Sequence, residues 1–143
     1  MEKASFSFKN YRFEKALIDL KDLSMDSSVD FQFLPKGIYN KDTGVFCLYL
    51  NFIANADNGN NKKEIINIEC YAEFEFNTAL SLEEIPSFFY PNSIAILFPY
   101  VRSFISTITL QANMPAIILP TMNLTNLQNK LKDNTTISEN YAE

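Results

Sequence analysis

The sequence has no histidine, and it has three glycines and two cysteines among its 143 residues. Without histidine the chain lacks the commonest general base and metal ligand, and every Ser-His or Cys-His nucleophile pair is excluded. The three glycines form neither a P-loop nor a dinucleotide-binding turn. The acidic residues are scattered over strand and turn positions, and no pair of them is marked as catalytic. These absences predict a protein that is not an enzyme and that needs no cofactor.

The two cysteines, Cys47 and Cys70, fall in separate strand-like segments and have neither a close partner nor the spacing of metal ligands. We interpret them as small buried hydrophobic residues, so no metal site is predicted. The segment Met1–Ala4 lacks the apolar core of a signal peptide. Because no apolar run is long and uniform enough to span a membrane, we expect a cytoplasmic protein without direct membrane insertion.

Positive charge is also scarce, since 12 basic residues stand against 17 acidic ones and the net charge is -5. The chain therefore cannot neutralise a phosphate backbone, and we expect no nucleic-acid partner. The basic doublet Lys62-Lys63 lies in a run of Asn and Gly, which we interpret as a solvated loop. Aromatic residues are abundant, with 13 Phe and 7 Tyr. They favour strands and surfaces that hold partners.

Apolar and polar residues alternate with a period of two in the first half of the chain, which predicts strands. The alternation is found around Phe6 and Phe8, around Ile18 and Leu20, from Val29 until Pro35, and in the segments Val45–Asn55 and Ile65–Phe76. The segments Asn40–Gly44 and Ala56–Lys63 have the composition of turns. Consecutive strands joined by turns predict an antiparallel meander with one covered face.

The long segment Ser93–Gln111 carries a single charge and has apolar residues at helical spacing. Asn92 is a suitable N-cap, and Pro99 inside the pattern predicts a bend. The face opposite the apolar one is small or uncharged, with Ala95, Ser103, Ser106, Thr107 and Gln111. A helix without a charged side is normally covered on both sides, so we assign the last four of these residues to an oligomer interface. An ordinary core helix of a monomer is the alternative.

The last part of the chain is apolar at first and polar at its end. The segment Met114–Met122, which we call the crossover, contains prolines and is predicted to cross a surface in extended form. Asn123 and Thr125 are suitable caps for a final helix. From Lys132 onward the residues are polar. We therefore predict a single domain over residues 1–132 and a disordered tail over residues 133–143.

A combination of short motifs lies between residues 91 and 127. It consists of Pro91-Asn92, Leu97-Phe98-Pro99-Tyr100-Val101-Arg102, Ile105-Ser106, Pro115, and Leu119-Pro120 with Asn123-Leu124. This combination resembles the SecB family of protein-export chaperones. The chain departs from the family pattern in three places. Ser93–Ala95 looks inserted, Ala112-Asn113 replaces a Gly-Gly pair, and Thr121 replaces a proline. The chain thus looks like a divergent SecB-like member.

The resemblance implies an α+β fold in which a four-stranded antiparallel sheet is covered by a long helix and a shorter C-terminal helix. It also implies a homotetramer, a dimer of dimers, that binds unfolded preproteins and delivers them to the SecA motor. In the family, an acidic patch on the sheet is the docking surface for the motor. The candidates for such a patch here are Asp19, Glu69, Glu73 and Glu75. A merely solvated strand face explains the same acids equally well.

The crossover and the final helix have the composition expected of a client-binding groove. A protein that holds unfolded chains needs exposed apolar surface of adaptable shape in a soluble, acidic particle. The predicted groove consists of Met114, Ile117, Ile118, Leu119, Met122, Leu124, Leu127 and Leu131. Ordinary core packing under a loop is the alternative for these side chains.

Two hypotheses about function follow. The first is a holdase chaperone of the export type, or a relative that protects one dedicated client such as an antitoxin. The second is a non-chaperone binding module that holds a small ligand or scaffolds an assembly. Stoichiometric suppression of the aggregation of a non-native protein distinguishes the two.

Overall fold

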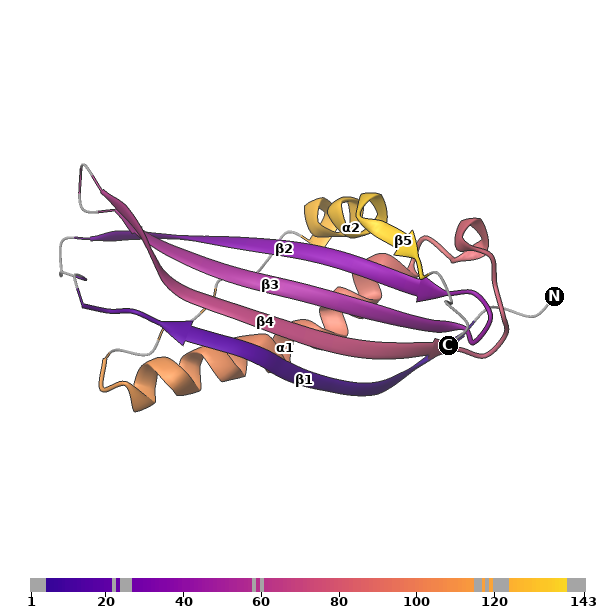
Figure 1. The fold of residues 1–143 in the computed structure, drawn as a ribbon, viewed down its shortest axis with the longest axis horizontal. Coiled ribbons are helices and arrows are strands. Elements are labelled where there is room, and N and C mark those ends of the chain that lie inside the picture. The colour runs from indigo at the N-terminus through magenta and orange to yellow at the C-terminus, as the bar shows by residue number, and fades with distance from the viewer. Residues whose placement is uncertain are drawn as a thin grey trace.

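A computed structural model of the chain describes residues 5–21, 23, 27–57, 59, 61–114, 117, 119 and 124–138. The strands are β1 (Phe6–Ile18), β2 (Ser28–Asn40), β3 (Val45–Asp57), β4 (Lys62–Phe76) and β5 (Thr135–Ile137). The helices are the short 3-10 turn η1 (Leu82–Glu84), α1 (Phe89–Gln111) and α2 (Leu124–Asp133). Figure 1 shows α1 crossing one face of the sheet diagonally and α2 lying beside β2. No described helix covers the other face, which we call the uncovered face.

The strands lie in the order β1-β4-β3-β2-β5, which confirms the predicted meander only in part. β2, β3 and β4 are antiparallel neighbours, as predicted. β1, however, pairs with β4 and not with β2, and β5 pairs in parallel with β2. The sheet is therefore five-stranded and mixed, and the prediction of a four-stranded antiparallel sheet is wrong. Periodicity identifies a strand and its apolar face. It does not identify the neighbouring strand, because β1 keeps its apolar face toward the core whether it pairs with β2 or with β4.

The tail that was predicted to be disordered contains β5. Asp133 ends α2, and Thr135–Ile137 follow as a strand. These three residues are β-branched, which favours extended backbone. Thr135 is also buried, and its hydroxyl donates a hydrogen bond to the carbonyl of Leu131 at 2.5 Å. Disorder is therefore wrong for residues 135–137, whereas residues 139–143 lie outside the described part of the chain and the domain boundary stays a prediction.

β2 continues through Pro35 to Asn40, although the alternation predicted its end at Pro35. The amide of Gly37 donates to the carbonyl of Asn134 at 3.2 Å, so it points away from β3. Pro35 lies two residues earlier and has the same orientation, which means that its missing N–H would also have pointed away from β3. The side-chain amide of Asn134 donates to the Pro35 carbonyl at 3.4 Å. A proline is tolerated at a sheet edge for this reason.

Helix α1 begins at Phe89, four residues before the predicted start, and Phe88 takes the cap position predicted for Asn92. Pro91 lies in the first turn, where backbone N–H groups have no partner within the helix, so the proline costs no hydrogen bond. Pro99 lies inside the helix, which continues to Gln111. The bend at Pro99 stays a prediction.

The core lies between α1 and the apolar face of the sheet, and Phe89 occupies one end of it. The Phe89 ring is fully buried. Its centroid lies 4.9 Å from that of Phe6 in β1, 4.7 Å from Phe46 in β3, and 4.8 Å from Phe76 in β4. Rings at these separations contribute packing energy beyond their buried area. This cluster fixes the start of α1 against three strands.

We expect Gly37→Ala to destabilise the fold, because β5 packs closely against Gly37. An added Cβ would lie 2.6 Å from the Thr135 hydroxyl oxygen and still closer to the ring of Phe46. Overpacking of this kind costs about 1–3 kcal/mol of unfolding free energy. Urea denaturation measures the loss. Lys36→Ala, at an exposed position of the same strand, is the control, and equal unfolding midpoints for the two variants would contradict the prediction.

Candidate functional site

One edge of the sheet is open along the first part of β2. β5 pairs with β2 only from Gly37 to Tyr39, and no described strand pairs with the outward side of residues 28–36. The register between β2 and β3 has no shift, so the two-residue alternation that directs the Gly37 amide outward also applies to Val29, Phe31 and Phe33. We call this segment the open β2 edge. It presents backbone donors and acceptors to any extended chain beside it.

Apolar side chains border the open β2 edge on the side of α1. The half-buried Phe31 ring stacks on Phe52 at a centroid separation of 5.7 Å. Phe33 is buried and lies 5.8 Å from the ring of Phe98, which belongs to α1. Val29 is also half-buried beside the core. The sequence analysis did not identify this edge, although Pro35 within an alternating segment was a signal of an edge strand.

The structure places the predicted groove residues partly in the core. Leu119, Leu127 and Leu131 are buried, and Met114 and Ile117 are half-buried. Leu124 begins α2, whereas Ile118 and Met122 lie outside the described residues. The buried leucines contact a client only if the crossover or α2 moves. Their role in client binding stays a prediction.

The residues assigned to an oligomer interface lie together on the outward face of α1. Ser103, Thr107 and Gln111 are exposed, and the half-buried Ser106 donates to the carbonyl of Ile117 at 3.0 Å. Leu110, on the same helix, is 62% exposed. At these positions the face is uncharged, with the apolar Leu110 exposed among them, and the oligomer interface assigned to it stays a prediction.

An aromatic seam joins α1 to β1, the other edge strand. The ring centroids of Tyr11 and Tyr100 are 4.3 Å apart, and Phe13 stacks on Phe104 at 4.0 Å. Both tyrosines are exposed. Sequence periodicity did not reveal the seam, because the register shift between Phe8 and Asn10 moves Tyr11 and Phe13 onto the same face as Phe8.

Three of the four predicted docking acids share the uncovered face. Glu69, Glu73 and Glu75 alternate along β4 with residues that point into the core. Asp19 is not near Glu75. It comes directly after Ile18, which pairs with Ile66, and Ile66 lies about 30 Å from Glu75 along β4. It accepts a hydrogen bond from Lys63 Nζ at 3.1 Å, and this bond is the main cause that lowers the pKa of Asp19 below its ordinary value.

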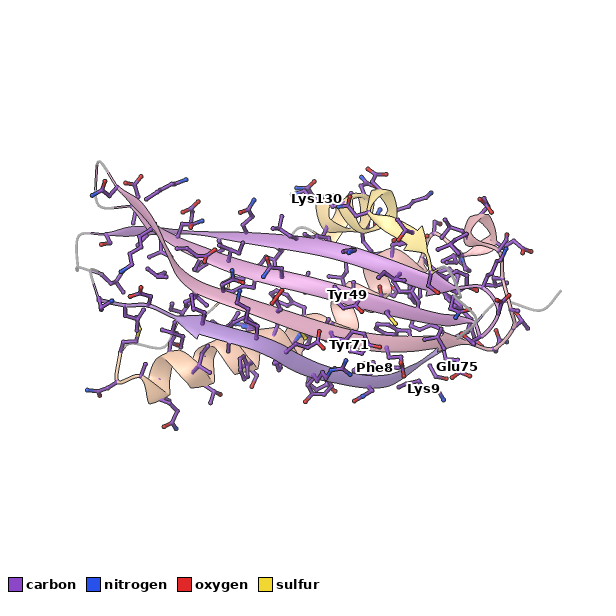
Figure 2. All side chains as sticks on the ribbon, in the orientation of Figure 1. Phe8, Lys9, Tyr49, Tyr71, Glu75 and Lys130 are labelled. Carbon is purple, nitrogen blue, oxygen red and sulfur yellow. The ribbon has the colours of Figure 1, made fainter. Side chains whose placement is uncertain are left out.

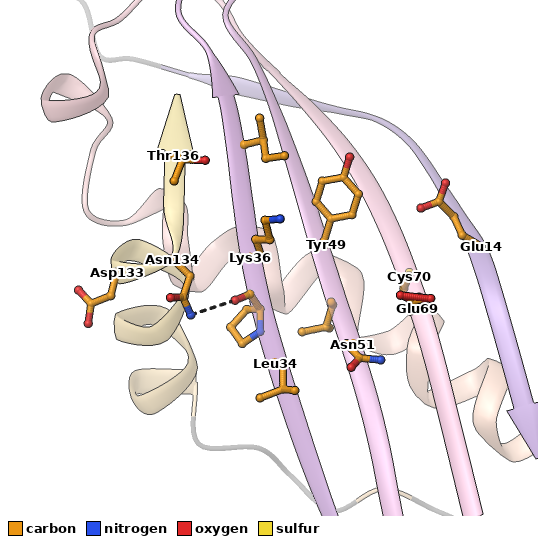
Figure 3. A pocket seen from close by; sticks show the side chains of 13 residues that line it. Glu14, Leu34, Lys36, Tyr49, Asn51, Glu69, Cys70, Asp133, Asn134 and Thr136 are labelled. Atoms are coloured by element: carbon orange, nitrogen blue, oxygen red, sulfur yellow. Dashed lines mark hydrogen bonds between the residues drawn. The ribbon is translucent and has the colours of Figure 1, made fainter. Parts of the chain in front are cut away.

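The uncovered face contains a hollow of about 740 Å³ between β1 and β5. Tyr49, Asn51 and Lys36 contribute side chains near its centre, Glu14 lies on one side, and Thr136 lies on the other (Figure 3). The hollow is lined by both charged and apolar groups. No group of three or more potential metal ligands occurs among the described residues, so the hollow offers no built metal site.

Tyr71 and Cys47 form a hydrogen-bonded pair on this face. The Tyr71 hydroxyl lies 3.3 Å from Cys47 Sγ, and it donates to Glu73 at 3.1 Å. The guanidinium of Arg12 lies 4.1 Å from the centre of the Tyr71 ring. Burial, followed by the hydrogen bond with Cys47, raises the pKa of Tyr71. Figure 2 shows Tyr71 beside Tyr49 of the next strand, with their rings 5.2 Å apart.

Helix α1 has the length and composition of a membrane span, a property that core helices of soluble proteins share. In the structure its apolar side is packed on the sheet. Ile94, Leu97, Val101 and Ile105 are all buried there. Helix α1 therefore uses its apolar side to cover the sheet.

Comparison with known proteins identifies the fold. No protein-family model matches the chain. An uncharacterized protein of Methanocaldococcus jannaschii is 38% identical over 81 residues, which are 54% of this chain and 52% of that protein. The chain thus spans about half the length of this curated relative.

Two solved structures are similar in shape. One is the SecB-like chaperone of Mycobacterium tuberculosis in complex with a ChAD peptide from the HigA1 antitoxin. It has a TM-score of 0.64 and 15% identity, and the match covers 82% of this chain and 91% of the other. A protein of unknown function from Streptococcus agalactiae has a TM-score of 0.48 and 11% identity, over 84% of this chain and 100% of the other. The mycobacterial structure shows that the chain has a SecB-like fold.

We expect iodoacetamide to modify Cys47 and to leave Cys70 unmodified in the folded protein. Burial raises the pKa of Cys70 to about 12 and leaves its side chain inaccessible, whereas Cys47 is half-buried on the uncovered face. Mass spectrometry of peptides after labelling at about pH 8, near the ordinary thiol pKa, measures the difference. Both cysteines should react in urea. Equal rates in the folded protein would show that Cys70 is exposed.

Proposed function

We propose that the chain is a chaperone-like protein without catalytic activity that holds extended segments of non-native polypeptides in the cytoplasm. The observation that carries this proposal is the open β2 edge, where backbone groups and apolar side chains lie together in a SecB-like fold. Each of these two features suits an unfolded chain, because an unfolded chain exposes both its backbone and its apolar side chains.

The proposed mode of binding is the addition of a client strand to the sheet. A client in extended form pairs its backbone with Val29, Phe31 and Phe33, and every second client side chain then lies toward α1. Phe31 and Phe98 are the half-buried aromatic surface on that side. Backbone pairing is independent of the client sequence, while the aromatic surface favours apolar client residues.

The predicted groove extends this site toward α2. Helix α2 lies beside β2. Its residues Leu127 and Leu131 are buried, as is Leu119. In the proposal, the half-buried Ile117 and Met114 contact clients first. The leucines become accessible to clients if the crossover shifts. Contacts of this kind are apolar, so the affinity should depend little on salt.

The proposal also concerns which polypeptides are the clients. The mycobacterial chaperone of similar fold was determined with a peptide from an antitoxin, which supports polypeptides as clients and favours a dedicated one. Export precursors and delivery to a SecA motor remain the proposed alternative. For that role, Glu69, Glu73 and Glu75 are the docking acids on the uncovered face. The hollow beside Tyr49 favours a second candidate function, the binding of a small ligand.

We further propose that the chain assembles as a dimer of dimers. Two exposed surfaces support this proposal: the outward face of α1, with Ser103 and Thr107, and the solvent side of the aromatic seam at Tyr11 and Tyr100. The small side chains of the first surface allow two helices to approach closely. The exposed tyrosines of the second are typical of protein interfaces.

We expect Phe31→Ser to weaken client holding without unfolding the protein. Loss of the half-buried ring removes on the order of 1 kcal/mol of contact with a client, which is about fivefold in affinity. The measurement is the suppression of aggregation of a chemically denatured protein at equimolar chaperone. Gln32→Ser is the control, because Gln32 is exposed on the uncovered face of the same strand. If wild-type protein fails to suppress aggregation, the proposed function is wrong.

We expect Thr107→Glu to split the tetramer into smaller units, since a carboxylate would be desolvated between two uncharged helix faces at a cost of several kcal/mol. Multi-angle light scattering at micromolar concentration gives the mass of each variant. Asn126→Glu adds the same charge at an exposed position of α2 and should leave the mass unchanged. A monomeric wild type would refute the assembly.

A further inference from the structure

The open β2 edge ends where β5 begins, and the two segments belong to one continuous edge. β2 pairs with β3 from Ser28 to Asn40 without a register shift. The outward backbone groups therefore run from Val29 to Tyr39 along a single strand, interrupted at Pro35, which has no N–H and whose carbonyl accepts a hydrogen bond from the Asn134 side chain. β5 occupies only the last part of this edge, where Gly37 donates to the Asn134 carbonyl at 3.2 Å and Ser138 donates to the Tyr39 carbonyl at 2.8 Å.

β5 is weakly held on this edge. It is three residues long and pairs with one strand only. Thr135 is its single buried residue, whereas Thr136 and Ile137 are exposed, the latter by 41%. A strand with so few contacts opens at a low free-energy cost relative to the core strands.

We propose that β5 is a displaceable competitor for the client site. A client strand that starts on the open β2 edge continues into the Gly37–Tyr39 segment and takes the place of β5. The inference rests on the proposed function, because it requires that clients pair with β2. It makes the client site longer than the part that is open in the structure, and it makes β5 the element that limits client affinity.

Competition by β5 lowers the affinity for a client, and the size of this effect depends on the length of the client. β5 is tethered through α2, so it competes at an effective concentration on the order of millimolar. Each backbone hydrogen bond is worth roughly a factor of two to ten in affinity. A short client that pairs only with Val29–Phe33 does not meet β5. A client of about 11 residues, at ~3.3 Å per residue, spans the whole edge and must displace β5.

A disulfide between β5 and β2 tests the exchange directly. Ile38 and Thr136 are paired neighbours. Neighbouring strands lie about 4.8 Å apart, within the Cα separation that a disulfide bridges. The variant is Ile38→Cys with Thr136→Cys in a Cys47→Ser background, because Cys47 lies opposite Ile38 in β3 and would compete for the bond. The same protein after reduction is the matched control.

The probes are two fluorescent peptides with alternating Phe and Ser, one of about 12 residues and one of about 5. We expect oxidation to weaken binding of the long peptide about tenfold and to leave binding of the short peptide unchanged. A second variant that ends at Thr135 keeps the buried residue and removes the rest of β5, so it should bind the long peptide several-fold more tightly than wild type.

The outcomes separate this inference from the proposed function. Equal affinity of the oxidised and reduced protein for the long peptide would show that β5 is not displaced, while the proposed function would stand. Equal affinity of the truncated and wild-type proteins would likewise overturn the inference. Failure of both peptides and of an unfolded protein to bind wild type would overturn the proposed function together with the inference.

Discussion

The packing of Phe89 against three strands is the contact on which the rest of the structure depends. It fixes the start of α1 on the sheet, and the rings of Phe98 and Phe104 continue the contact toward β2 and β1. One helix covers one face of a sheet, so this arrangement leaves a second face and two edges to other elements or to partners.

The two edges of the sheet differ in their suitability for pairing. β1 carries two register shifts and the charged residues Lys9, Arg12 and Lys15, which are devices that hinder the addition of another strand. The open β2 edge has a regular register, and Phe31 beside it is half-buried. Pro35 costs no hydrogen bond to β3, but it leaves a client strand without one backbone donor at that position. The β2 edge is thus the one that fits an extended client, whereas β1 offers a side-chain surface through its aromatic seam.

The sequence was sufficient for β3, β4, most of β2 and the presence of both helices, because their alternation and helical spacing are set by a single buried face. It was insufficient where the determining contact is between distant residues. The pairing of β5 depends on Gly37 and Thr135, which are far apart in the chain, and three residues carry no periodicity. A leucine stripe such as Leu127 and Leu131 also does not reveal from sequence alone whether it faces a client or the core; both side chains are buried, and their role in client binding stays a prediction.

The proposed site binds a client through backbone contacts and through side-chain contacts. These two kinds of contact differ in how selective they are for the client sequence. Pairing with Val29 and Phe33 through the backbone accepts any extended sequence without proline at the paired positions. Selectivity must then arise from the surface at Phe31 and Phe98 and from the contacts needed to displace β5. A client that offers only backbone pairing competes poorly with a tethered strand, so the site favours long segments with apolar residues at alternate positions. Such a requirement is met by many unfolded proteins, and a dedicated client meets it best if its side chains match the two rings.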